Sequence, residues 1–127
     1  MTPLETVQAF IRAVEAHDVD AAIALTAPSI SYENVPIAPI VGHDGLRATL
    51  ESFLGPAAEV DWQIGRELAV GSVVVNERLD RFRIGDGWLE LPVAGFFEVD
   101  DEGKISLWRD YFDLQTYMTR FAELTGG

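Results

Sequence analysis

The feature of this sequence that most restricts its fold is a long extended region between residues 58 and 113. It divides into four stretches rich in β-branched and aromatic residues, separated by Gly71, by Gly-Asp-Gly at residues 85–87 and by Asp-Asp-Glu-Gly at residues 100–103. Such short turn signals are typical of hairpins, so consecutive stretches are expected to pair antiparallel. The second half of the chain therefore predicts a four-stranded antiparallel meander.

Most of the remaining chain has the pattern of helices. A capping-box pattern at residues 2–5 begins a helix that is expected to end near His17, where Asp18 is a candidate N-cap for a short second helix. Apolar residues at helical spacing predict a third helix over residues 43–54 and a short closing helix over residues 114–124. These helices can cover one face of the sheet.

A short early strand at residues 29–35 completes the expected elements. Helices followed by a long sheet indicate the α+β class, with a curved antiparallel or mixed sheet wrapped as a cone over the N-terminal helices. The chain contains no internal repeat and no linker composition. Residues 1–127 are therefore interpreted as a single domain.

Charge and composition exclude several function classes. The 21 acidic and 9 basic residues give a net charge of −12, which repels phosphate backbones and anionic lipids, so neither nucleic acid nor a membrane is expected as a partner. With no cysteine and two histidines, no metal-ligand set is expected, and no other cofactor is predicted. The N-terminus has no signal-like apolar core, and the expected location is the cytoplasm.

Residues 76–82, Asn-Glu-Arg-Leu-Asp-Arg-Phe, place polar side chains where a core is expected. Successive side chains of a strand point to opposite faces, so Arg78 and Asp80 share the face of Phe82. Asn76 lies in the same row. An arginine and an aspartate in a buried row are costly to desolvate and often contribute little net stability, so their presence indicates a reason other than folding.

The same alternation applies to the last strand, where Asp110 lies between Trp108 and Phe112 on one face. In the early strand, Tyr32 and Asn34 also share a face and add a phenol and an amide. These faces belong to strands of one sheet. We therefore expect these polar side chains to converge in one apolar pocket.

Two carboxyl groups close together in a dry site cannot both ionise cheaply, so they tend to share one proton. An arginine between them offsets the remaining charge and fixes their orientation. The pocket then contains one protonated and one ionised carboxyl group. This pair can act as general acid and general base at neutral pH, each contributing a factor of roughly 10² to 10⁴ in rate.

Three stretches resemble signature segments of the limonene-1,2-epoxide hydrolase family: Tyr-Glu-Asn at 32–34, Arg-Leu-Asp at 78–80 and Trp-Arg-Asp-Tyr-Phe-Asp at 108–113. The resemblance extends from the first helix to the last. It implies the cone-shaped α+β fold shared with nuclear transport factor 2, scytalone dehydratase and ketosteroid isomerase. It also implies an Asp–Arg–Asp triad that opens an epoxide in one step, without a covalent intermediate or a metal.

The resemblance assigns a role to each polar residue of the pocket. Asp110 would deprotonate a water molecule that Tyr32 and Asn34 also hold. Asp80 would protonate the epoxide oxygen, and Arg78 would bridge the two carboxyl groups. The expected substrate is a small, mostly apolar epoxide. The expected apolar walls are Phe82, Val93, Trp108 and Phe112.

Other interpretations of the same residues exist. An isolated Arg–Asp pair on a strand is more often a surface pair, which contributes only about 0 to 1 kcal/mol. A ketosteroid-isomerase-like proton shuttle also uses Tyr and Asp in an apolar cone, but Arg78 would lower the pKa of an aspartate that must stay protonated. A non-catalytic binding module of the same fold is the third possibility, and it leaves the polar residues without a common purpose.

The outward-facing rows of the sheet mix apolar and charged residues in the way that an interface does. Together with the resemblance, this pattern predicts a homodimer, in which Arg81 or Arg109 meets Glu77 across the two-fold axis. The residues expected in these outward rows are Val73, Val75, Glu77, Leu79 and Arg81 of the second strand, and Ile105, Leu107, Arg109 and Tyr111 of the last.

Overall fold

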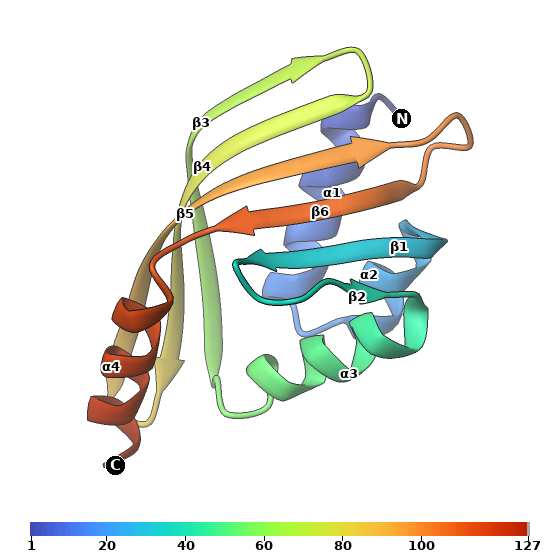
Figure 1. The fold of residues 1–127 in the computed structure, drawn as a ribbon. Coiled ribbons are helices and arrows are strands. Elements are labelled where there is room, and N and C mark those ends of the chain that lie inside the picture. Colours follow the sequence, from blue (N-terminus) through green and yellow to red (C-terminus); the bar gives the residue numbers. More distant parts are fainter. Residues whose placement is uncertain (127) are drawn as a thin grey trace.

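The computed structural model describes residues 1–126 and shows a strongly curved sheet flanked by helices (Figure 1). In chain order the elements are α1 (Pro3–Glu15), α2 (Val19–Ala24), β1 (Thr26–Val35), β2 (Ile40–Val41), α3 (His43–Leu54), β3 (Glu59–Val70), β4 (Val73–Ile84), β5 (Gly87–Val99), β6 (Ile105–Tyr111) and α4 (Leu114–Thr125).

The strands form one sheet in the order β2-β1-β6-β5-β4-β3. Strands β3 to β6 pair antiparallel in sequence, as the hairpin signals predicted, whereas β1 pairs with β6 in parallel. The sheet is therefore mixed, curved and not closed into a barrel, and the predicted α+β class is confirmed. In Figure 1, β3, β4 and β5 bend along their length, and the N-terminal helices lie on one side of the sheet.

The helices begin where the sequence predicted. Thr2 and Glu5 form a reciprocal capping box on α1, and Asp18 caps α2 by accepting from the Ala21 amide. The buried stripe of α1 includes Phe10, whose ring meets that of Trp108 edge-on with centroids 5.0 Å apart. This contact joins α1 to the middle of the sheet. Across residues 1–126, no helix has both the length and the apolar character needed to cross a bilayer.

The structure differs from the sequence-based expectation at three places in its elements. Strand β1 begins at Thr26, three residues before the predicted start, because Thr26 already pairs with Ile105 of β6. The prolines at positions 36 and 39 and Gly42 predict only a loop before the third helix, but this segment contains the short strand β2. The spacing of apolar residues in the closing helix predicts Leu114, Met118 and Phe121 on its inner side. On α4, Phe121 does pack against the core, as does Tyr117, but Met118 is 60% exposed.

The prediction that Ile105 faces outward is wrong. Val99 pairs with Ile105 but Glu98 pairs with Leu107, so β6 contains one extra residue, a β-bulge. The bulge turns Ile105 into the core, where it is fully buried, while the alternation after it leaves Trp108 and Asp110 facing inward. Strict period-two counting fails across such an irregularity.

A second bulge interrupts the register between β3 and β4. Ile64 pairs with Arg78 but Arg66 pairs with Glu77, which leaves Gly65 as the extra residue on β3. Before the bulge the even-numbered residues of β3 face inward, and after it the odd-numbered residues do. The consequence is that Glu67, and not Arg66, is opposite Asn76.

Candidate active site

The inward row of β4 contains the polar residues that the sequence singled out. Asn76, Arg78 and Asp80 are all buried, with exposed fractions of 1%, 3% and 4%. Asp110 reaches the same place from β6, although β5 lies between the two strands. Sheet register explains this meeting, because Gly95 of β5 pairs with Asn76 on one side and with Asp110 on the other.

Gly95 leaves the space in which the arginine crosses β5. A Cβ atom at this position would overlap Arg78 Nη1 and lie 2.8 Å from Asp110 Oδ1. Any larger residue would therefore displace the guanidinium from its position between the strands. Gly95 lies inside the extended region predicted from the sequence, and no periodic signal there distinguishes it.

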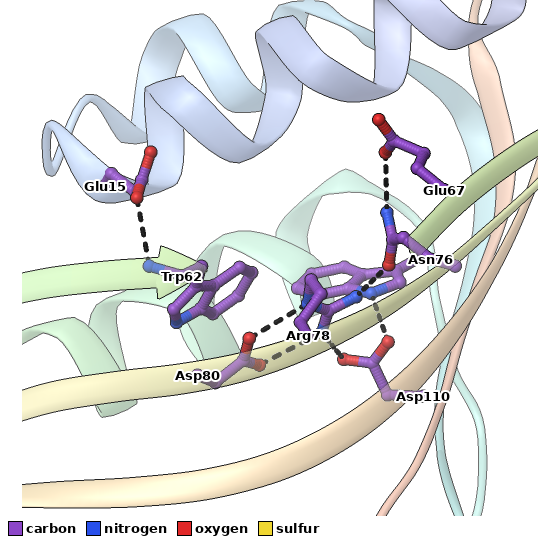
Figure 2. A network of polar contacts seen from close by, with 8 residues as sticks. Glu15, Trp62, Glu67, Asn76, Arg78, Asp80 and Asp110 are labelled. Carbon is purple, nitrogen blue, oxygen red and sulfur yellow. Dashed lines mark hydrogen bonds and ion pairs between the residues drawn. The ribbon is translucent and has the colours of Figure 1, made fainter. Parts of the chain in front are cut away.

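Arg78 bridges the two carboxyl groups (Figure 2). Its Nε donates to Asp80 Oδ1 at 2.9 Å and its Nη2 to Asp80 Oδ2 at 3.0 Å. The same Nη2 donates to Asp110 Oδ2 at 2.9 Å. Because the Arg78 side chain is fully buried, these charged hydrogen bonds are shielded from solvent.

Strand β1 brings the remaining polar residues to the same end of the sheet. Its parallel register with β6 places Tyr32 beside Trp108 and Asn34 beside Asp110. The Tyr32 and Trp108 rings stack with centroids 4.0 Å apart, and Trp108 Nε1 donates to Asp110 Oδ1 at 2.9 Å. Each oxygen of Asp110 thus accepts one hydrogen bond from a buried donor.

These residues border a cavity of about 230 Å³. Of the predicted site residues, Tyr32, Asn34, Asp80 and Asp110 line it, together with the predicted walls Phe82, Val93 and Phe112. Two predicted residues lie behind the lining: Arg78, which bridges the carboxyl groups, and Trp108. Trp108 differs from the expectation that it forms a wall, because its fully buried ring packs beneath Tyr32.

The remaining lining residues were not identified from the sequence. Alternation along the strands could have identified two of them. Trp62 lies in the inward-facing row of β3, and Leu91 lies two residues before Val93 in the inward-facing row of β5. Side chains from helices and loops lack such a signal, since they reach the cavity only through the tertiary fold. The lining residues without a prediction are Ile37, Thr49, Ser52, Phe53, Trp62, Leu91, Leu114 and Tyr117.

Burial dominates the protonation of the carboxyl pair. It raises the pKa of Asp80 from 3.8 to about 6, although the charge and hydrogen bonds of Arg78 oppose the shift. Burial also raises the pKa of Asp110 against the opposing effect of Arg78. For Arg78, burial disfavours the charged form, but the two carboxyl groups outweigh it and raise the pKa. One cation thus faces a pair that retains a proton more strongly than free aspartates do.

Trp62 forms the aromatic side of the site. The Arg78 guanidinium carbon lies 5.0 Å from its ring centroid, a cation–π distance, and the ring also contacts Phe82 edge-on. Its Nε1 is buried and has no hydrogen-bond partner among the described residues. Asp80 pairs with Trp62 across the strands and therefore lies on this apolar side, whereas Asp110 lies beside Asn34.

Other polar residues from the sequence analysis lie apart from the site. Arg109 donates to Glu33 at 2.8 Å on the outer face, and Asp113 caps α4 by accepting from the Gln115 amide. The ring nitrogens of His17 and His43 lie at hydrogen-bonding distance from backbone carbonyl oxygens. Among residues 1–126, no group of three or more His, Cys, Asp or Glu side chains is arranged as a metal site.

The model of the limonene-1,2-epoxide hydrolase catalytic domain matches residues 1–123 of the chain. The chain belongs to this family. It is 40% identical over 109 residues to epoxide hydrolase EphG of Mycobacterium tuberculosis, an alignment that covers 85% of this chain and 71% of that protein. It is therefore an epoxide hydrolase of the limonene-epoxide hydrolase type, and the predicted family and enzyme class are confirmed.

Solved structures agree with this membership. A limonene-epoxide-hydrolase-like epoxide hydrolase of M. tuberculosis superposes with a TM-score of 0.82 at 33% identity, covering 98% of this chain and 92% of that one. A SnoaL-like protein from Shewanella denitrificans superposes with a TM-score of 0.80 at 16% identity, over 95% of this chain and 97% of that one. The second similarity shows the fold alone. The ketosteroid-isomerase-like alternative is not favoured.

The contact between Gly95 and Arg78 predicts a specific effect of Gly95→Ala on this epoxide hydrolase. The added methyl group overlaps Nη1 and forces the guanidinium away from Asp110, so kcat is expected to fall at least about tenfold while the fold is retained. Gly65→Ala is the matched control, because a Cβ there meets only the Glu77 carbonyl oxygen at 3.5 Å. Diol formation and circular dichroism of both variants measure the effect. Equal kcat in the two variants would contradict it.

Proposed function

We propose that this epoxide hydrolase opens a small, mostly apolar epoxide to a vicinal diol in one step, without a covalent intermediate. Asp110 accepts a proton from a water molecule that Tyr32 and Asn34 help to hold. The water oxygen bonds to an epoxide carbon as that carbon–oxygen bond breaks, and Asp80 gives its proton to the departing oxygen. Arg78 bridges both carboxyl groups throughout.

The single observation that carries this proposal is the bridging of Asp80 and Asp110 by one buried guanidinium. A cation held by both groups allows one of them to be protonated and the other ionised at the same time. This is the state in which an acid and a base can act together on one substrate. Each carboxyl group also lines the cavity, so both can reach the same bound molecule.

The surroundings of the two carboxyl groups support the direction of proton transfer. Asp110 lies beside Asn34 and Tyr32, whose amide and phenol groups can hold water. Asp80 lies opposite Trp62 and beside Phe82, on the apolar side of the cavity where a hydrocarbon substrate fits. The polar side thus suits the water and the base, and the apolar side suits the epoxide and the acid.

Asp80→Asn and Asp110→Asn test these assignments. Each substitution keeps the size of the side chain but removes one half of the acid–base pair, so kcat for diol formation is expected to fall at least roughly 100-fold. Circular dichroism should stay near wild type. Terpene, cyclohexene and styrene oxides provide a substrate panel. Either variant with more than about a tenth of wild-type kcat would show that its residue is not the acid or the base.

The raised pKa of Asp80 predicts a decline of kcat as pH rises through about 6, because the general acid loses its proton there. Stability should change in the same pH range. The folded chain binds this proton more tightly than the unfolded chain does, so its contribution to the free energy of unfolding falls as pH rises from about 4 to about 6.

Asp80→Asn is the control for this prediction, since it lacks the titrating group. Its free energy of unfolding relative to wild type is expected to increase between pH about 4 and about 6 in chemical denaturation. A difference that stays constant over this range would mean that the pKa of Asp80 is not raised.

We also propose that the chain forms a homodimer through the outer face of its sheet. Leu68 pairs with Val75, which pairs with Phe96, and this row leaves Leu68 69% and Phe96 38% exposed. Tyr111 packs against Phe96 and is 42% exposed, which extends the apolar row across β6. A second copy that packs its equivalent row here buries both.

The expected ion pairs across the two-fold axis need revision, because these charges have partners within the chain. Arg109 pairs with Glu33, Arg81 with Asp61 and Glu90, and Glu77 with Arg66. The proposed interface therefore depends on apolar contacts rather than on Glu77.

Light scattering at micromolar concentration tests the dimer. The expected mass is twice the 14.0 kDa of one chain, because association buries the exposed apolar row. Leu68→Lys is expected to shift the mass toward one chain. A mass of one chain for the wild type would contradict the proposed interface.

A further inference from the structure

Arg78 has a hydrogen-bond donor that neither carboxyl group uses. Its Nε and Nη2 serve Asp80 and Asp110, whereas its Nη1 donates to Asn76 Oδ1 at 2.9 Å. Asn76 is 1% exposed and is not among the residues that line the cavity. Its contact with the site therefore passes entirely through Arg78.

The Asn76 amide is held in one orientation from its other side. Its Nδ2 donates to Glu67 Oε2 at 3.2 Å, and Glu67 Oε1 in turn accepts from Gln8 Nε2 of α1 at 2.9 Å. Figure 2 shows this line of contacts from Glu67 through Asn76 to Arg78. A reversed amide would turn its NH₂ group toward the guanidinium and its oxygen toward the carboxylate. Both contacts would then be repulsive.

The bulge at Gly65 is what places Glu67 opposite Asn76. Trp62 and Ile64 face inward, so unbroken alternation would turn Leu68 inward and Glu67 outward. The extra residue reverses this parity, at the cost of leaving Leu68 69% exposed. Bulges often re-aim a side chain next to an active site. Here the re-aimed side chain is the carboxylate that orients Asn76.

We propose that Asn76, oriented by Glu67, is a positioning residue that holds Arg78 so that one guanidinium serves both Asp80 and Asp110. This inference rests on the proposed acid–base function of the pair. An amide fits the task because it supplies an acceptor without a third negative charge beside the cation. The positive charge of Arg78 is then left to the two carboxyl groups.

Several titratable groups surround the pair and contribute to its pH dependence. They come from β4, β1, α1, β3 and α4. The groups that face it or line its cavity are Arg78, Tyr32, Glu15, Glu67 and Tyr117. A test must therefore change the charge next to Arg78 while the total charge and the other groups stay the same.

The double variant Asn76→Asp with Glu67→Gln meets this condition. The amide and the carboxylate exchange places, so the amide introduced at position 67 can donate to the new carboxylate and its carbonyl can still accept from Gln8. The total charge is unchanged, but a negative charge now contacts Arg78 directly. Asn76→Leu is the second variant, since it fills similar space without an acceptor. Glu77→Gln on the outer face, where Glu77 pairs with exposed Arg66, is the charge control.

We expect Asn76→Leu to lower kcat at least about tenfold with KM within about twofold, because Asn76 does not line the cavity. The double variant should keep kcat within about tenfold of wild type, with the alkaline limb of its pH profile moved up by about half a pH unit or more. A third carboxylate beside Arg78 offsets part of its positive charge, so Arg78 lowers the pKa of the aspartate pair less than it does in wild type. Glu77→Gln should match wild type in kcat, KM and pH profile.

An unmoved alkaline limb in the folded double variant would overturn the inference, even if Asn76→Leu is inactive or does not fold, because Asn76 would then only fill space. Wild-type kcat and pH profile in a folded Asn76→Leu would overturn it as well. Asp80→Asn is measured alongside. If Asp80→Asn is fully active, the proposed function and this inference are both wrong. If Asp80→Asn is inactive but the alkaline limb of the double variant's pH profile is unmoved, only this inference is wrong.

Discussion

The buried cation of Arg78 is the constraint on which the rest of the site depends. A fully buried guanidinium without acceptors would be strongly destabilising, and removing one partner of such a group typically costs about 3 to 5 kcal/mol. Asp80, Asp110 and Asn76 each accept from it, and the Trp62 ring lies against it. The aspartates thus compensate the charge of Arg78, and the proposed acid–base chemistry uses the same contacts, so folding and proposed chemistry rest on one set of contacts.

The order of the strands in the sheet allows the Arg78 side chain to contact both aspartates. Arg78 starts on β4 and must pass over β5 to meet Asp110 on β6, which is possible because Gly95 lies between them. The parallel pairing of β1 with β6 then sets Asn34 beside Asp110. Curvature of the sheet and the packing of α3 and α4 close an apolar cavity over the pair. Family membership fixes the class of reaction, and these contacts supply a physical account of it.

Much of this arrangement could be predicted from the sequence because alternation is a local rule. Arg78 and Asp80 share a row with Phe82, and Asp110 shares one with Trp108, so their inward direction follows from counting. Counting fails where a bulge adds a residue, which is why Ile105 was predicted outward and Glu67 was not connected to Asn76. Gly95 and the helix residues of the cavity depend on tertiary approach, which leaves no periodic signal.

The central claim is that Asp80 and Asp110 share one proton under the charge of Arg78, and infrared spectroscopy of the carboxyl groups tests it most directly. A protonated carboxyl group has a carbonyl stretch that a carboxylate lacks, and exposed acidic residues are ionised at pH just below 6. Wild type should then show the band of one buried protonated carboxyl group, which titrates near the Asp80 pKa of about 6. The band should be absent from Asp80→Asn, which lacks the carboxyl group whose pKa burial raises. A wild-type spectrum without this band at pH just below 6 would contradict the account.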